Sequence, residues 1–348
     1  MFLRQVDDFA IACTDEAIAK SIIGQINTHM SVQIKYLGLL TRYNGVDVNQ
    51  TREYIHIYNS TYINKILAGH SSWFKKQTPC HTFPIPMKSE SSYIKHLEQA
   101  IPPATDKARI RLQREMKFNY WQAIGELIYT MVTCQPDISF PLIKLSQYST
   151  NPSREHYDAV KDIFYYLNCT KYEGIYYWRP MPNEDLPPIT TSHETESTTE
   201  CEAKIQDTPH QLKAATDSDW GGDTTHRKSV TGFVIKLAGG SIYYKSKFQV
   251  TIALSSCEAE FVAATKTGKV LLYVQTILEE IGLAQDNATI LHIDNNGALN
   301  MANQSQPTQN TRHMELKHFT IQQWVERDWG AFYITPVNII LITHFPSL

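Results

Sequence analysis

Apolar positions recur at helix-like or strand-like intervals along most of the chain, and residues 181–209, which lack such a pattern, divide it in two. Before that stretch, continuous or alternating apolar runs predict strands, and spacings of three and four residues predict helices. The predicted strands are 2–6, 9–13, 35–40, 54–58 and 174–178, and the predicted helices are 16–30, 60–67, 120–134, 137–148 and 152–168. The second half of this region is therefore mainly helical.

After residue 209 the pattern changes to three strands followed by alternating helices and strands. Gly239-Gly240 supplies a tight turn between the second and third strands, and Gly282 ends the long helix that follows them. The predicted elements are strands 211–216, 232–237 and 241–245 with an extension at 250–254, helix 258–281, strand 289–293, helices 297–303 and 312–328, and strand 331–335. This order indicates an α/β (α+β) fold with a mixed sheet.

Residues 181–209 have the composition of a linker. The stretch is rich in Pro, Thr and Ser, and residues 181–208 hold one Lys against seven acids. Such a segment cannot bury enough apolar surface to offset the entropy of ordering. The preceding 180 residues hold 20 Lys/Arg against 16 Asp/Glu, a mildly basic balance that is compatible with a phosphate-backbone partner.

The overall composition is that of an ordinary globular protein, since 42% of the 348 residues are hydrophobic and 19% are charged. The length suffices for two domains with separate cores. No apolar stretch is long enough to span a membrane, and Asp7 and Asp8 follow Arg4 too closely for a secretory signal peptide. The six cysteines include no Cys-x-x-Cys pair, which predicts no zinc knuckle or disulfide framework and favours a reducing, intracellular setting.

Three acidic positions fall at the ends of predicted elements after the linker. Asp217 follows a strand, Glu260 lies in the first turn of the long helix, and Asp294 closes the strand 289–293. Clustered carboxylates repel one another unless cations neutralise them, and hard divalent ions prefer oxygen ligands. Ser255 and Glu258 form a capping-box pattern, in which Glu258 returns to the backbone amide of Ser255 and leaves Glu260 free to point inward. The alternative is that both glutamates only complement the helix dipole.

A second acidic spot lies near the start of the chain, where Asp7 and Asp8 sit at the tip of a predicted hairpin. An Asp-Asp pair at such a tip suits a catalytic Mg²⁺ site, but it is also compatible with a polar turn, where Asp is common. These residues alone do not decide between the two interpretations.

Short motifs run in a fixed order through nearly the whole chain. They are Val6-Asp7-Asp8, Tyr36-Leu37-Gly38, Ile124–Tyr129, Pro136–Phe140, Asn151-Pro152, Asp217–Asp223, Arg227–Gly232, Ala253–Phe261, Asp294-Asn295 and Arg312-His313. In this order they resemble the C-terminal part of the Pol polyprotein of copia-type LTR retrotransposons, the end of reverse transcriptase followed by ribonuclease H. The resemblance implies a partial palm hairpin with a thumb and connection region over residues 1–180, the linker 181–209, and a ribonuclease H-like domain over residues 210–348.

The resemblance also implies an activity. Asp217, Glu260 and Asp294 would hold two Mg²⁺ (or Mn²⁺) ions and cleave the RNA strand of an RNA–DNA hybrid. Arg227 and Lys228 would contact phosphate, or else form an exposed charged loop. The expected partners are nucleic acid and other parts of the polyprotein, with no membrane, and the expected location is the cytoplasmic retrotransposon particle or the nucleus rather than outside the cell.

Two departures from the family pattern limit these expectations. The chain starts at the Val-Asp-Asp hairpin and carries no upstream palm strand with its further metal-binding Asp, so we expect no polymerase activity from Asp7 and Asp8. Near the C-terminus, Ile340-Leu341 stands where the family has Ala-Asp, so Leu341 replaces a fourth carboxylate. A catalytically dead nucleic-acid-binding remnant or pseudogene product is therefore the alternative. An integrase-like transferase fits the motifs around Asp217 and Glu260 less well.

Overall fold

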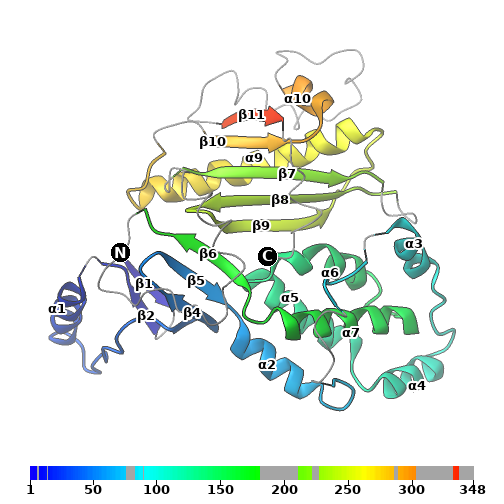
Figure 1. Cartoon of the computed structure of the whole chain (residues 1–348), viewed down its shortest axis with the longest axis horizontal. Coiled ribbons are helices and arrows are strands. Elements are labelled where there is room, and N and C mark those ends of the chain that lie inside the picture. Colours follow the sequence, from blue (N-terminus) through cyan, green and yellow to red (C-terminus); the bar gives the residue numbers. More distant parts are fainter. Residues whose placement is uncertain are drawn as a thin grey trace.

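The computed structural model describes residues 1–5, 8–13, 15–75, 83–88, 90–180, 211–221, 227–285, 289–302 and 332–336 (Figure 1). Within these ranges the strands form a two-stranded, a four-stranded and a five-stranded sheet. We call residues 1–180 the first part and residues 211–336 the second part. The predicted linker and the predicted helix 312–328 lie outside the described residues.

The first part begins with an antiparallel hairpin of β1 (Phe2–Gln5) and β2 (Asp8–Ile11), followed by α1 (Glu16–Asn27). The antiparallel four-stranded sheet that follows has the order β3-β4-β5-β6 and comprises β3 (Arg42–Tyr43), β4 (Val46–Gln50), β5 (Tyr54–Tyr58) and β6 (Gly174–Trp178). The predicted strand 35–40 is wrong. Its backbone is irregular, and Leu37 is 91% exposed, so no apolar face is buried there.

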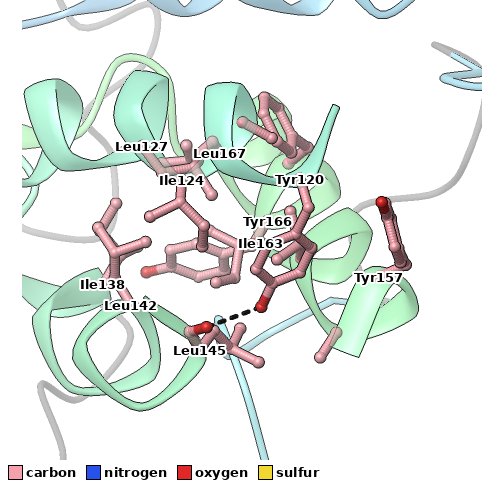
Figure 2. Close-up of a cluster of buried hydrophobic side chains, with 14 of the residues drawn as sticks. Tyr120, Ile124, Leu127, Ile138, Leu142, Leu145, Tyr157, Ile163, Tyr166 and Leu167 are labelled. Carbon is pink, nitrogen blue, oxygen red and sulfur yellow. Dashed lines mark hydrogen bonds between the residues drawn. The ribbon is translucent and has the colours of Figure 1, made fainter. Parts of the chain in front are cut away.

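The helices of the first part after α1 pack around one core. They are α2 (Ser60–Gly69), α3 (Ser91–Gln99), α4 (Asp106–Met116), α5 (Tyr120–Thr133), the 3₁₀ turn η2 (Pro136–Ile138), α6 (Ser139–Ser146) and α7 (Arg154–Cys169). Leu127, Ile138 and Ile163 are fully buried in this core, and the Tyr120 hydroxyl donates to the Leu145 carbonyl over 2.8 Å (Figure 2). The aromatic ring of Tyr120 therefore adds apolar area without leaving its polar end unpaired.

The N-terminus of α7 differs from the predicted one by two residues. The predicted helix 152–168 begins at Pro152, whereas α7 begins at Arg154 and Ser153 is its cap. Ser153 and His156 close a reciprocal capping box, in which each backbone N–H donates to the other's side chain. A histidine ring nitrogen here takes the acceptor role that Glu or Gln usually has, which the sequence pattern did not show.

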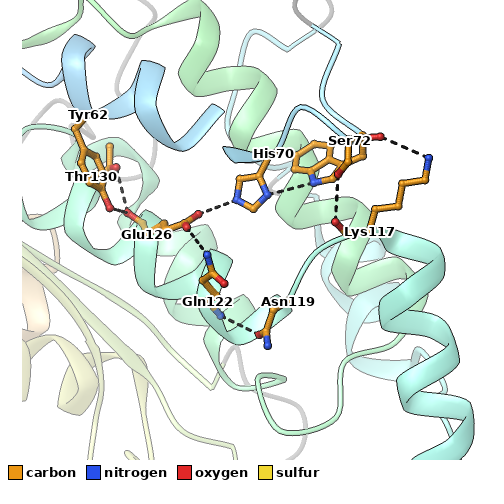
Figure 3. A network of polar contacts seen from close by, with 9 residues as sticks. Tyr62, His70, Ser72, Lys117, Asn119, Gln122, Glu126 and Thr130 are labelled. Atoms are coloured by element: carbon orange, nitrogen blue, oxygen red, sulfur yellow. Dashed lines mark hydrogen bonds and ion pairs between the residues drawn. The ribbon is translucent and has the colours of Figure 1, made fainter. Parts of the chain in front are cut away.

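A polar network holds α2 against α5 (Figure 3). Glu126 accepts from Gln122 over 2.9 Å and contacts His70 Nε2 over 2.7 Å, while the Trp73 indole donates to His70 Nδ1 over 3.3 Å. Because Nδ1 accepts, Nε2 carries the proton and donates to the Glu126 carboxylate. Both nitrogens of this buried imidazole are therefore satisfied, which explains how His70 is accommodated beside Phe164 in the helical core.

The second part is a five-stranded sheet in the order β11-β10-β7-β8-β9, with a long helix along one face (Figure 1). Its elements are β7 (Lys213–Asp219), β8 (Val230–Leu237), β9 (Gly240–Phe248), α9 (Ser256–Glu280), β10 (Thr289–Ile293), α10 (Asn296–Ala302) and β11 (Phe332–Pro336). The first three strands are antiparallel, and β10 runs parallel to both β7 and β11. Fully buried Ile235, Phe261 and Leu291 join the sheet to α9. The predicted extension at 250–254 is not a strand.

The two parts contact each other along β9 and the turn before it. The Tyr244 hydroxyl donates to the carbonyls of Met131 (2.8 Å) and Val132 (3.0 Å) at the end of α5. From β6, the Tyr177 hydroxyl donates to the Ser241 carbonyl, and the Trp178 backbone N–H donates to the Ala238 carbonyl. The edge of the five-stranded sheet is thus covered by the first part instead of being open to pairing.

Two further expectations concern cysteines and membranes. Cys13, Cys134 and Cys257 are free, whereas Cys169 takes part in a disulfide bond that the cysteine spacing did not predict. In the part of the chain that the structure describes, no helix combines the length and the hydropathy that crossing a bilayer requires.

Candidate metal centre

Three carboxylates from distant parts of the sequence meet at one end of the five-stranded sheet. Asp217 lies near the end of β7, Asp294 follows β10, and Glu260 lies in the first turns of α9. Because β7 and β10 are parallel neighbours with Thr216 paired to Ile293, the next residues of both strands emerge side by side. One carboxylate oxygen of each acid lies within 4.8 Å of the other two.

The backbone of β7 orients two of these acids. The Ser218 N–H donates to Asp217 Oδ1 and to Glu260 Oε1, both over 2.8 Å. This shared donor holds the helix glutamate against the strand aspartate. It leaves the second oxygen of Glu260, Oε2, buried and without a hydrogen-bond partner in the described residues. A buried carboxylate oxygen without a partner is costly and is usually explained by an ion or another group that binds there.

The electrostatics of the cluster favour a cation. Glu260 is only 5% exposed, and burial together with the charges of Asp217 and Asp294 raises its pKa to about 9. Burial, followed by the charge of Asp294, also raises the pKa of Asp217. Both shifts express the same difficulty, namely that negative charges close together in a poorly solvated site destabilise one another. The residues therefore fit a divalent cation, which would remove this repulsion and pair the free oxygen.

The start of α9 explains which glutamate enters the cluster. Ser255 caps the helix by accepting from the Glu258 N–H over 3.1 Å. The Glu258 side chain returns to the backbone N–H of Leu254 over 2.7 Å, not to that of Ser255 as the capping-box pattern predicts. The box is thus displaced by one residue, but the outcome is the same. Glu258 accepts a hydrogen bond from the backbone at the N-terminus of the helix, and Glu260 points inward.

Two charged residues of the first part, Lys144 and Glu98, lie near Asp219, and neither was identified from the sequence. Lys144 of α6 and Glu98 of α3 form a buried ion pair with an N–O distance of 3.5 Å. Burial raises the pKa of Asp219, two residues beyond Asp217, and the nearby Lys144 ammonium opposes that rise. Nothing in the local sequence around Lys144 signals this role, because the contact depends on how the two parts pack.

Among the other candidate residues, Asp8 is not part of the cluster and is exposed in β2, far along the chain from the carboxylates. Asp7 lies outside the described residues, as does Leu341, which stands in place of the family's fourth carboxylate. Arg227 lines a cavity of about 130 Å³ together with Trp220, Gly221, Ile252 and Ala253. Lys228 follows it directly before β8. The structure therefore places Arg227 on the same side of the sheet end as Trp220, three residues beyond Asp217.

The strand order, the connections and the three acids define the class of the second part. The sheet has three antiparallel strands, followed along the chain by a long helix and by two further strands that are added in parallel on the side of the first strand. The carboxylates lie on the first strand, on the helix and directly after the fourth strand. This arrangement is a ribonuclease H-like mixed sheet with helices. Among solved structures, LC11-RNase H1 isolated from compost matches 36% of this chain and 85% of its own, with 15% sequence identity and a TM-score of 0.28.

Comparison with curated sequences finds similar proteins over nearly the whole length of the chain. It is 28% identical over 328 residues to the retrovirus-related Pol polyprotein from transposon TNT 1-94 of Nicotiana tabacum, and 25% identical over 336 residues to that from transposon RE2 of Arabidopsis thaliana. These alignments cover 94% and 97% of the chain, which spans about a fifth of the two polyproteins (22% and 20%). No protein-family model matches. Over nearly its whole length the chain is thus similar to a fragment of the retrovirus-related Pol polyproteins of transposons.

Proposed function

We propose that the second part is a metal-dependent ribonuclease that cleaves the RNA strand of RNA–DNA hybrids. The observation that carries this proposal is the approach of one oxygen each of Asp217, Glu260 and Asp294 to within 4.8 Å, beside a Glu260 oxygen that has no hydrogen-bond partner among the described residues. Mg²⁺, or Mn²⁺ in its place, is the cation that this all-oxygen set suits.

The proposed mechanism assigns distinct tasks to the side chains. Asp217, Glu260 and Asp294 would hold the divalent cation, which when bound would supply positive charge at the scissile phosphate and lower the pKa of the attacking water. The Ser218 N–H fixes the directions of the Asp217 and Glu260 carboxylates, and β10 delivers Asp294 to their side. Fixed ligands of this kind need no reorganisation during the reaction, which is the main source of electrostatic catalysis.

The rest of the chain is proposed to serve substrate binding. We assign residues 1–180 to the end of a copia-type reverse transcriptase, with a palm hairpin, thumb and connection, residues 181–209 to a linker, and residues 210–348 to the ribonuclease domain. Arg227 and Lys228 would contact phosphates of the hybrid. The intracellular retrotransposon particle, together with other parts of the polyprotein, is the proposed setting.

Polymerase activity is not part of the proposal for this chain. Asp8 alone among the hairpin acids is described, and it is exposed on β2. Two metal ions for nucleotide addition need more carboxylates than the Asp7-Asp8 pair provides. Templated nucleotide incorporation by the purified chain would contradict this statement.

The proposal is tested by cleavage of a hybrid whose RNA strand is end-labelled. We expect the wild-type chain to cut the RNA in Mg²⁺ and not in EDTA, and Asp294→Asn to lose at least about a hundredfold in rate, since a ligand carboxylate is removed. Duplex DNA and duplex RNA serve as control substrates. Equal rates for both chains, or no cleavage by either, would contradict the proposal. Salt-dependent hybrid binding without cleavage would support a catalytically dead binding protein instead.

A further inference from the structure

Gln249 is a buried polar side chain that no part of the mechanism above uses. It follows β9 directly and is 1% exposed, between the ends of β7 and β8 and the first turn of α9. Its backbone N–H donates to the Ser229 carbonyl over 2.7 Å, which anchors the residue before β8. A side-chain amide enclosed in this way needs partners, since buried polar groups without them destabilise the fold.

The amide nitrogen of Gln249 contacts three segments. Nε2 donates to the Ala259 carbonyl over 2.9 Å, and lies 3.0 Å from Thr231 Oγ1 and 3.3 Å from Ser218 Oγ. The Ala259 carbonyl fixes the orientation of the amide, because exchanging its nitrogen and oxygen would set two acceptors against each other. The amide oxygen, Oε1, is buried and has no hydrogen-bond partner in the described residues. Within the part of the chain that the structure describes, the hydrogen bonds of this side chain are therefore all made by its nitrogen.

The segments that Gln249 joins are those that carry two of the three acids. Ser218 follows Asp217 and supplies the N–H shared with Glu260, while Ala259 immediately precedes Glu260. When both are ionised, the Asp217 and Glu260 carboxylates repel each other, which favours separation of the strand end from the helix start. A side chain that bonds to both segments opposes this separation and keeps the two carboxylates at the distance a single cation can bridge.

We propose that Gln249 is a positioning residue that sets the separation of Asp217 and Glu260 and thereby the affinity of the site for a divalent cation. The inference rests on the proposed function, because it assumes that the three carboxylates bind a cation. Gln249 touches neither the cation nor the substrate. Gln249 acts on the separation of the Asp217 and Glu260 carboxylates before a cation binds.

The test is a Mn²⁺ titration of the full chain in which the midpoint temperature of thermal unfolding is measured at each Mn²⁺ concentration. A cation that binds only the folded chain raises this midpoint with a concentration dependence that reports its affinity. The variants are Gln249→Ala and Gln249→Met, the latter keeping most of the volume in case the cavity in the former prevents folding. The matched control is Gln135→Ala, since Gln135 is also buried (2% exposed) and donates to two carbonyls, those of Thr170 and Glu173, in the first part.

We expect the Mn²⁺ concentration that gives half of the maximal rise in the unfolding midpoint to be at least about tenfold higher in both Gln249 variants than in the wild type. Losses of this size are typical when a residue that supports a metal ligand is removed. Gln135→Ala should lower the midpoint in EDTA while keeping the wild-type Mn²⁺ dependence. Wild-type dependence in the Gln249 variants, or an equal change in Gln135→Ala, would overturn the positioning role alone. Absence of any Mn²⁺ response in the wild type would overturn the metal site itself and this inference with it.

Discussion

At the scale of single residues, the carboxylate cluster is a place where the fold is destabilised by its own charges. Glu260 has a pKa of about 9 because burial and two neighbouring carboxylates oppose its ionisation. Since this value lies above that of the unfolded chain, the folded chain holds a proton between about pH 4.5 and pH 9 that the unfolded chain releases. Stability of the cation-free chain is therefore lost as the pH rises through this window.

Glu260→Gln should therefore stabilise the cation-free protein. The neutral amide removes the repulsion while keeping an oxygen to accept from Ser218, so we expect a gain of about 1–3 kcal/mol in the free energy of unfolding at pH 8 in EDTA. The same variant should show no stabilisation by Mg²⁺. Urea unfolding at pH 8 with EDTA or Mg²⁺ measures both effects, and a variant less stable than the wild type in EDTA would contradict the prediction.

A second residue links stability to acid pH. His56 on β5 is 5% exposed, stacks on Tyr58 and Tyr176, and has a buried Nε2 without a partner in the described residues. Burial lowers its pKa from 6.5 to about 4. Below pH 6.5 the unfolded chain binds a proton that the folded chain excludes, so stability falls as the pH drops from about 6.5 to 4, by about 3 kcal/mol in total.

His56→Phe should remove this acid sensitivity, because phenylalanine keeps the stacked ring and does not titrate. The difference in unfolding free energy between variant and wild type should grow in favour of the variant between pH 7.5 and pH 4.5. Denaturant titrations at both pH values measure it. A difference that does not change with pH would show that His56 does not cause the acid dependence.

At the scale of elements, the sequence predicted the type of most strands and helices but not their ends. The apolar period of the second part gave its strand and helix order, because one face of each element packs on α9 or the sheet. The positions of Asp217, Glu260 and Asp294 at element ends therefore could be anticipated. Gln249 and Lys144 could not, since their contacts join residues whose proximity depends on tertiary packing rather than on local spacing.

The start of α9 gives a prediction that separates its two glutamates. Glu258 accepts from the Leu254 N–H at the helix end, whereas Glu260 is in the carboxylate cluster. We therefore expect Glu258→Gln to keep hybrid cleavage within about threefold of the wild type and Glu260→Gln to reduce it at least about a hundredfold. Initial cleavage rates in Mg²⁺ test this. Equal losses in both variants would mean that the helix start, not one carboxylate, determines activity.

At the scale of the whole molecule, the two parts behave as one packed unit along β9. Gly240 begins this strand, and a Cβ added there would lie 2.6 Å from the Tyr176 carbonyl oxygen and from the Tyr177 ring of the first part. Such a distance cannot be tolerated without moving backbone. The four-stranded sheet of the first part therefore approaches the second part as closely as a glycine permits.

This close approach predicts opposite effects of two glycine substitutions. Gly240→Ala should lower the free energy of unfolding by more than about 2 kcal/mol, because the two parts must separate to admit the methyl group. Gly125→Ala in α5, where nothing lies within 4 Å of the added Cβ, should raise it by up to about 1 kcal/mol through helix propensity. Chemical denaturation of both variants is the measurement, and a neutral Gly240→Ala would contradict the described contact between the parts.

The central claim, that Asp217, Glu260 and Asp294 together bind a divalent cation, is tested most directly by anomalous X-ray diffraction from crystals of the full chain soaked in Mn²⁺. We expect an anomalous peak between these three carboxylates, with Glu260 Oε2, which has no partner among the described residues, as one of the ligands. A data set in which Mn²⁺ peaks occur elsewhere on the molecule, or nowhere, while the three side chains are well ordered would contradict it.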